Sequence, residues 1–126
     1  MGIQVILKMV ADRNRLRIIN IIKDNALCVG EIQTLLGTTQ SNTSRHLEKL
    51  KSSGLTDYYK DAQRIFYFIK KDVFIKYRFF NDLVYIDTLK DNQFIQDAER
   101  LEKYKASGLN CEDLRSIGFD YNKIIF

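Results

Sequence analysis

Apolar residues recur with the period of an amphipathic helix from Arg13 to Lys23. One face of this predicted helix is expected to meet the core, and Arg15 and Lys23 are expected to point toward solvent. The apolar positions are Leu16, Ile18, Ile19, Ile21 and Ile22.

A second helix is predicted from Cys28 to Leu36, where apolar residues again follow helical spacing. Glu31 stands three residues after Cys28, in the position of a capping-box glutamate. Gly37 follows the last apolar residue and is expected to end the helix.

A third helix is predicted from Gln40 to Ser52, with Thr39 as its N-cap and Gly54 as its left-handed stop. Leu47 and Leu50 lie on one side of this helix. The opposite side is largely polar and carries Ser41, Ser44, Arg45 and Lys49.

The period falls to two after Gly54, which indicates strands rather than helices. Residues 55–59 alternate in polarity, and residues 64–69 are rich in β-branched and aromatic side chains. A short basic turn, Lys60 to Gln63, joins the two strands into a hairpin.

Helical spacing returns from Asp72 to Leu89, and a further helix is expected from about Asp91 to Lys105. Asn110 is a good N-cap for a short turn from Cys111 to Ser116. The predicted fold is mainly α with a small β-hairpin, in the order α-α-α-α-β-β-α-α, which is a winged helix-turn-helix. We expect a DNA-binding domain over residues 1–71 and a C-terminal helical dimerisation segment over residues 72–126.

The polar face of the third helix has the residue types that read DNA. The second helix of a helix-turn-helix lies in the major groove, where Gln40 and Asn42 suit adenine and Arg45 suits guanine or phosphate. Short hydroxyls suit phosphate oxygens, and the hairpin tip can reach the DNA backbone or the minor groove. A merely solvated polar face is the alternative. The predicted DNA contacts are Thr39, Gln40, Ser41, Asn42, Ser44, Arg45, His46, Lys49, Lys60, Gln63 and Arg64.

Charge is unevenly distributed in a way that favours a polyanionic partner for the first part of the chain. Residues 1–80 hold 14 basic and 7 acidic side chains, a net +7, whereas residues 81–126 hold 6 and 9, a net −3. The 126 residues suit a single domain. Wholly apolar runs are only a few residues long, so we expect a cytoplasmic protein with no secretory signal and no membrane contact.

Four stretches together resemble the ArsR/SmtB family of bacterial transcriptional repressors. They are VADRNRLRII at 10–19, LCVGEIQTLLG at 27–37, TQSNTSRHLEKLKSSGL at 39–55 and QRIFYFI at 63–69. The resemblance implies a homodimer, joined through its terminal helices, that binds palindromic double-stranded operator DNA and is released by an effector. It also assigns the recognition-helix positions to Gln40, Ser41, Ser44, Arg45 and His46.

Two residues depart from the family pattern within the DNA-binding region. Thr43 stands where the family usually has an apolar residue, so slightly weaker packing of the recognition helix is expected. Ala62 replaces the common glycine of the wing. A turn with positive φ at this position would cost about 1 kcal/mol, or another turn type would form.

The third departure concerns the effector site. Arsenic-sensing members have a CVC arrangement before the recognition helix, but this chain has Cys28, Val29 and Gly30, and a glycine offers no thiolate. The family's other metal site uses Asp, His and Glu on the C-terminal helix. Because the single histidine is His46, no zinc or nickel site of that kind is expected.

Cys28 and Cys111 are the candidate metal or redox residues. An N-cap position would lower the pKa of the Cys28 thiol and favour thiolate. The pair is a candidate for binding As(III) or another thiophilic ion across the dimer, or for forming a reversible disulfide. Neither residue belongs to a CxxC pair, so structural zinc and a structural disulfide are not expected. Two ordinary buried thiols are the alternative.

Other function classes receive less support from the sequence. No nucleophile and base combination and no glycine-rich phosphate loop is evident, so an enzyme is not expected. A winged-helix adaptor that contacts only proteins, with structural cysteines and no releasing effector, would have less reason to keep a basic polar face. A stripe of aromatic residues is expected to form core or subunit interface rather than a ligand cavity. It comprises Phe74, Tyr77, Phe79, Phe80, Tyr85, Phe94 and Tyr104.

Overall fold

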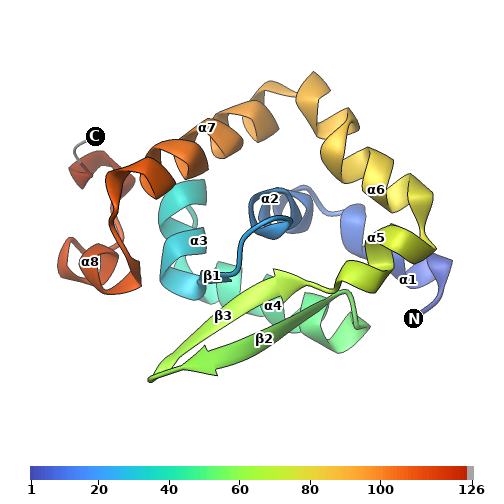
Figure 1. Ribbon diagram of the computed structural model, residues 1–126, viewed down its shortest axis with the longest axis horizontal. Helices are drawn as coiled ribbons and strands as arrows, with labels where there is room; N and C mark the ends of the chain where they lie inside the picture. Colours follow the sequence, from blue (N-terminus) through green and yellow to red (C-terminus); the bar gives the residue numbers. More distant parts are fainter. Residues whose placement is uncertain (125–126) are drawn as a thin grey trace.

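The computed structural model describes residues 1–124 and shows a group of helices with one small sheet at its edge (Figure 1). Among these residues no helix combines the length and apolarity that crossing a membrane requires. The elements are α1 (Ile3–Val10), α2 (Arg13–Ile22), β1 (Leu27–Cys28), α3 (Val29–Leu36), α4 (Gln40–Ser53), β2 (Thr56–Asp61), β3 (Arg64–Ile69), α5 (Lys71–Lys76), α6 (Arg78–Tyr85), η1 (Asp87–Lys90), α7 (Asn92–Ser107), α8 (Cys111–Ser116) and η2 (Tyr121–Lys123).

The winged helix-turn-helix prediction is confirmed, and so are the signals that bound its helices. The Thr39 hydroxyl accepts a hydrogen bond from the backbone N–H of Asn42, which caps α4. Gly37 and Gly54 follow α3 and α4 with φ of 69° and 88°, a backbone conformation that glycine adopts without steric cost.

The sheet contains one strand that the sequence pattern did not predict. Strand β1 is antiparallel to β3, with Leu27 opposite Tyr67 and Cys28 opposite Phe66, so the strand order is β1-β3-β2. Two residues are too few to display a period of two. The predicted hairpin is present as β2 and β3, with Asp61 opposite Arg64 beside the turn.

Of the two turn conformations expected at Ala62, the wing has the one with positive φ. The φ of Ala62 is +57°, which is strained for a residue with a Cβ. Replacing Ala62 with glycine removes the Cβ that makes this conformation unfavourable. We expect Ala62→Gly to raise the free energy of unfolding by about 0.5–1 kcal/mol in urea denaturation. A decrease would show that the greater freedom of glycine in the unfolded chain outweighs the relief of strain.

The C-terminal half contains more helices than predicted. The single helix expected from Asp72 to Leu89 is broken at Tyr77, whose φ of −123° and ψ of 92° are extended, and it ends in the 3₁₀ turn η1. Figure 1 shows α5 and α6 meeting at an angle. The bend allows Val73 of α5 and Phe80 of α6 both to enter the core.

Arg15 of α2 and Lys23, directly after α2, were expected to point into solvent, but both are at least half-buried. Arg15 is 8% exposed, and its guanidinium donates to the carbonyl oxygens of Met9 and Lys8 at 3.0 and 3.1 Å. Lys23 is half-buried and donates to the carbonyl oxygen of Val84 at 3.0 Å. Helical periodicity missed these contacts because a long cation can satisfy free carbonyl groups at the ends of neighbouring helices.

The aromatic stripe belongs to the core, as the sequence analysis favoured. Phe80, Phe94 and Tyr104 are buried, and the remaining members pack against the core cluster as half-buried side chains.

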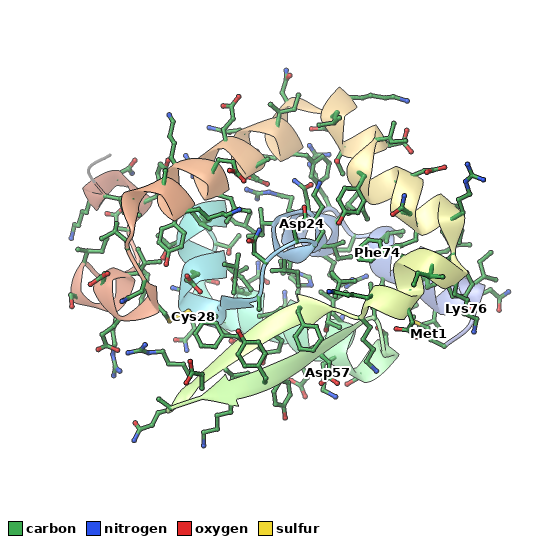
Figure 2. The ribbon with its side chains drawn as sticks, viewed as in Figure 1. Met1, Asp24, Cys28, Asp57, Phe74 and Lys76 are labelled. Atoms are coloured by element: carbon green, nitrogen blue, oxygen red, sulfur yellow. A yellow bond between two sulfur atoms is a disulfide. The ribbon has the colours of Figure 1, made fainter. Side chains whose placement is uncertain are left out.

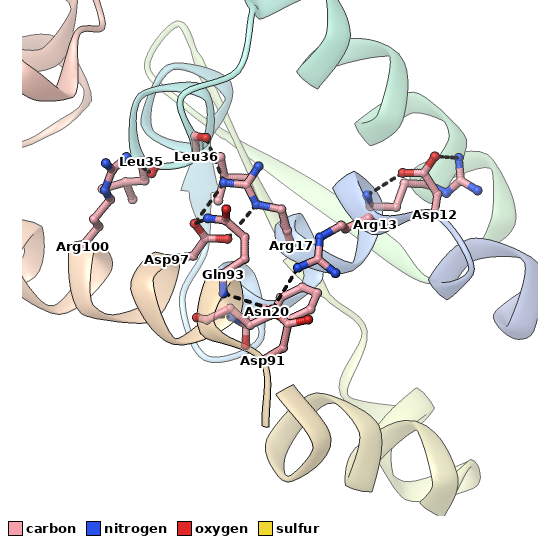
Figure 3. Close-up of polar contacts among 12 residues, drawn as sticks. Asp12, Arg13, Arg17, Asn20, Leu35, Leu36, Asp91, Gln93, Asp97 and Arg100 are labelled. Carbon is pink, nitrogen blue, oxygen red and sulfur yellow. Dashed lines mark hydrogen bonds and ion pairs between the residues drawn. The ribbon is translucent and has the colours of Figure 1, made fainter. Parts of the chain in front are cut away.

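Helix α7 packs against α2 and α3, and polar contacts join it to both helices (Figure 3). The Arg17 guanidinium donates to both carboxylate oxygens of Asp97, at 2.8 and 3.0 Å, and to the carbonyl oxygen of Leu36 at 2.9 Å. Asn20 donates to the carbonyl oxygen of Phe94 at 3.1 Å. These contacts fix the C-terminal segment on the helices that precede the recognition helix.

Candidate nucleic-acid interface and cysteine pair

The recognition helix α4 is anchored by one apolar side. Leu47 and Leu50 are fully buried, and α4 packs against α1, α2 and α3. Thr43 is 2% exposed, and its hydroxyl contacts the carbonyl oxygen of Thr39 at 2.8 Å and the hydroxyl of Thr38 at 2.7 Å. The buried hydroxyl of Thr43, the residue that departs from the family pattern, is therefore hydrogen-bonded.

The opposite side of α4 presents a polar surface to solvent. Asn42 is half-buried, and the guanidinium of Arg45 donates a hydrogen bond to its side-chain oxygen. This contact links two predicted base-reading side chains, which therefore lie next to each other on the same surface. The exposed members of the predicted set on this side are Thr39, Gln40, Ser41, Ser44, Arg45 and Lys49.

His46 does not share this exposed surface, so the expectation that it faces DNA is wrong. Its side chain is 6% exposed because it lies on the buried side of α4, and its Nδ1 has no hydrogen-bond partner among the described residues. Burial lowers the pKa of His46 below its usual value of 6.5. The Asp12 carboxylate opposes this shift, and the cations of Arg15, Arg45 and Lys49 add to it.

The wing tip presents polar and basic side chains beside the recognition helix. Lys60 and Gln63 are exposed at the end of the hairpin. Arg64, at the first position of β3, is instead half-buried and forms an ion pair with Glu112 of α8. The position of Arg64 at the hairpin tip predicts a contact with a DNA backbone, but nothing in the sequence indicates this partner 48 residues away.

Cys28 and Cys111 are joined in a disulfide within one chain, which is one of the possibilities that the sequence left open for this pair. The general expectation against a structural disulfide did not anticipate this bond. The 83 residues between them conceal the contact in the sequence, and the C-terminal extension brings Cys111 of α8 to the N-terminal end of α3. Figure 2 shows Cys28 at this end of α3, close to the hairpin. The Cys28 side chain is 3% exposed, whereas Cys111 is half-buried.

Cys28 also forms the predicted capping box of α3. Its sulfur accepts from the backbone N–H of Glu31 at 3.3 Å, and its own N–H donates to Oε1 of Glu31 at 2.9 Å. The hydroxyl of Tyr104 on α7 donates to Oε2 of the same carboxylate. Burial, followed by this hydrogen bond, raises the pKa of Tyr104. The capping spacing identified Glu31, but nothing in the sequence linked it to Tyr104.

The space beside Gly30, where the family's CVC pattern has its second cysteine, is filled by another side chain. A Cβ at this position would lie 2.4 Å from Cε1 of Phe119, so the aromatic ring of the C-terminal segment occupies that space. A cysteine at position 30 would exclude the ring. The chain thus has the Phe119 ring over α3 where the family pattern has a cysteine side chain, and Cys28 is bonded to Cys111 instead.

In the described part of the chain, one group of two cysteine sulfurs and one carboxylate has the spacing that a metal ion would need. The ligand atoms of Cys28, Glu31 and Cys111 lie within 4.8 Å of one another. A thiophilic ion could use the two sulfurs only after the disulfide is reduced, because ligation requires thiolates.

Known proteins share this arrangement of helices and wing. The family model described as "Bacterial regulatory protein, arsR family" matches residues 12–58. The solved structure of HlyU from Vibrio cholerae N16961 is 36% identical with a TM-score of 0.56, and the alignment covers 64% of this chain and 88% of HlyU. The chain belongs to the ArsR family. The family model includes Cys28 and α4 and ends before Cys111.

Two further proteins are also similar to this chain in sequence or in structure. The cadmium resistance transcriptional regulatory protein CadC of Listeria innocua is 38% identical over 64 residues, which are 50% of this chain and 54% of CadC. The homodimeric winged helix-turn-helix domain of Mb0332 from Mycobacterium bovis is 27% identical with a TM-score of 0.55, covering 64% of this chain and 79% of that domain. The chain spans about half the length of the curated ArsR-family relatives it matches.

Proposed function

We propose that this ArsR-family chain is a transcriptional repressor that binds double-stranded operator DNA through α4 and the wing. The observation that carries the proposal is the exposed polar and basic side of α4, whose first residue, Gln40, borders the same hollow as Gln63 and Arg64 of the wing. Arg45 and Lys49 supply cations on α4, and Lys60 supplies one on the wing. A protein-only adaptor gains little from this combination of short polar side chains and exposed cations, so DNA is the better supported partner.

In this proposal the repressor is a homodimer on a palindromic operator. Two recognition helices that read adjacent major grooves need a fixed spacing of about one helical turn. Exposed apolar side chains on the N-terminal helix α1 and along the segment from α5 to η1 support an interface there, and the Mb0332 domain is homodimeric. Residues 1–71 then read DNA and contribute Cys28 to the sensor, and residues 72–126 contribute Cys111 and, together with α1, hold the partner. The exposed apolar residues are Met1, Ile3, Val5, Leu7, Ile75, Ile86 and Leu89.

Oxidation of Cys28 and Cys111 is the proposed releasing signal. The sulfurs are already at bonding distance in one chain, and the N-terminal end of α3 favours the Cys28 thiolate in the reduced protein. That thiolate attacks a peroxide oxygen and becomes a sulfenic acid as the other oxygen leaves as hydroxide. The Cys111 thiol then displaces water and closes the disulfide. Starting from one thiolate and one thiol, the two cysteines lose two electrons and one proton, and the peroxide is reduced to one hydroxide and one water.

A thiophilic ion such as As(III) is a second candidate effector. The grouping of Cys28, Glu31 and Cys111 favours it, because two thiolates and one carboxylate lie close enough to bind one ion in the reduced protein. The ligands come from a single chain, so ion binding would not need the dimer. Loss of DNA binding on adding arsenite to the reduced protein, but not to Cys111→Ser, would support this effector.

The DNA proposal is tested by binding to the segment upstream of the protein's own gene under reducing conditions. Arg45→Ala is expected to cost about 1–3 kcal/mol at the operator and to relax specificity at one base. A matched control is Arg78→Ala, which removes an exposed cation from α6. Equal weakening on all DNA would make Arg45 a phosphate contact. Binding of neither operator nor other DNA by the unmodified protein would contradict the proposal.

A further inference from the structure

An ion pair connects the wing to the C-terminal extension. It joins Arg64, the first residue of β3, to Glu112, the residue directly after Cys111. Both side chains keep substantial exposure, 38% for Arg64 and 51% for Glu112. An exposed pair of this kind is weak by itself, so another anion can compete for the guanidinium.

Independent contacts hold α8 in the position that makes this pair possible. The disulfide fixes Cys111 on Cys28, and Leu114 of α8 is fully buried. Phe119, three residues after the last residue of α8, lies in the space left by the missing side chain of Gly30. Glu112 is therefore delivered to Arg64 by the docking of α8 and does not depend on the weak ion pair for its place.

The docked helix lies close to the elements that are proposed to meet DNA. A hollow of about 460 Å³ is lined by both cysteines, by Gln40 at the start of α4, and by Arg64 and Glu112. Figure 1 shows α8 beside α3 on the side toward the hairpin. The cysteine pair and the predicted DNA contacts thus border one surface depression.

We infer that α8 is an autoinhibitory segment: when Cys111 is bonded to Cys28, Glu112 occupies the Arg64 guanidinium that would otherwise bind a DNA phosphate. The inference rests on the proposed function and supplies a link between its sensor and its DNA surface. The disulfide keeps the carboxylate at a high effective concentration beside the guanidinium, so a weak pair becomes a persistent one. A carboxylate at this position also repels the approaching phosphate backbone.

Reduction removes the covalent attachment of α8 to α3. Glu112 then competes for Arg64 only through the noncovalent contacts of α8, and a phosphate that binds Arg64 in its place releases counterions. In a dimer each of two wings can then bind one further phosphate. The reduced protein should therefore bind DNA more tightly and with a steeper dependence on salt than the oxidised protein.

The test compares oxidised and reduced protein on operator DNA over a range of salt concentrations. For the unmodified protein we expect the slope of log affinity against log salt to be shallower by about 2 when oxidised, at about 0.9 for each phosphate that Arg64 no longer neutralises. Glu112→Gln frees Arg64 without breaking the disulfide, so the oxidised variant should regain the steeper slope and about tenfold in affinity. Glu102→Gln, an equal charge change on the exposed side of α7, is the matched control.

The outcomes separate this inference from the proposed function. An unmodified protein that binds no DNA in either redox state overturns both. Equal binding in the two states overturns control by the cysteines and the inference with it. A redox dependence that Glu112→Gln leaves unchanged overturns the inference alone, whereas loss of that dependence in Glu112→Gln but not in Glu102→Gln supports it.

Discussion

Replacing Asp97 with alanine is expected to lower the free energy of unfolding by about 3–5 kcal/mol. The Asp97 side chain is 1% exposed, and the Arg17 side chain that pairs with it is 13% exposed. Removing the carboxylate leaves a guanidinium in a site with little access to water, and only its hydrogen bond to the carbonyl oxygen of Leu36 remains. The loss of a partner for a buried charge is costlier than the loss of a surface pair.

Urea denaturation followed by circular dichroism measures this effect. Asp87→Ala is the matched control, because it removes an exposed carboxylate that pairs with Lys90 at 3.0 Å on the surface. The control is expected to change stability by less than about 1 kcal/mol. An Asp97→Ala protein within about 1 kcal/mol of the unmodified chain would show that α7 is not held by the buried pair.

Reduction of the disulfide is expected to lower the free energy of unfolding by about 3–4 kcal/mol. The bond closes a loop of 83 residues by sequence separation, and a loop of that length restricts the unfolded chain strongly. Part of the loss should appear as local loosening of α8 and the segment that carries Phe119, because only noncovalent contacts, such as the buried Leu114, hold them on α3 after reduction. The extension is therefore expected to exchange its amide protons faster after reduction.

Denaturation with and without a reductant measures the global effect, and hydrogen exchange locates it. The control is the double variant Cys28→Ser with Cys111→Ser, whose stability should not respond to the reductant. If reduction lowered the stability of the unmodified protein by less than about 1 kcal/mol, the disulfide would not be a major constraint on the folded chain.

Local sequence signals predicted the winged helix-turn-helix and the start of α8 well. Helix caps at Thr39 and Asn110, glycine stops at positions 37 and 54, and the alternation of the hairpin depend on neighbouring residues. Such signals can be read without tertiary information. The candidate DNA surface followed from the same patterns, apart from the buried His46.

The rest of the site depends on contacts between distant parts of the chain. The disulfide, the pair of Arg64 with Glu112, and the approach of Phe119 to Gly30 each join residues separated by tens of positions. No periodicity records such contacts. The missing thiol at Gly30 was visible, but only the structure shows that an aromatic ring fills the space.

The most direct test of cysteine-controlled DNA binding measures the affinity of the protein for the DNA upstream of its own gene after reduction and after treatment with peroxide. The account predicts tight binding of the reduced protein, at least tenfold weaker binding after peroxide, and restored binding on adding a thiol reductant. Cys28→Ser should bind like the reduced protein under all three conditions. Equal affinity of the unmodified protein before and after peroxide, with the disulfide shown to have formed, would contradict the account.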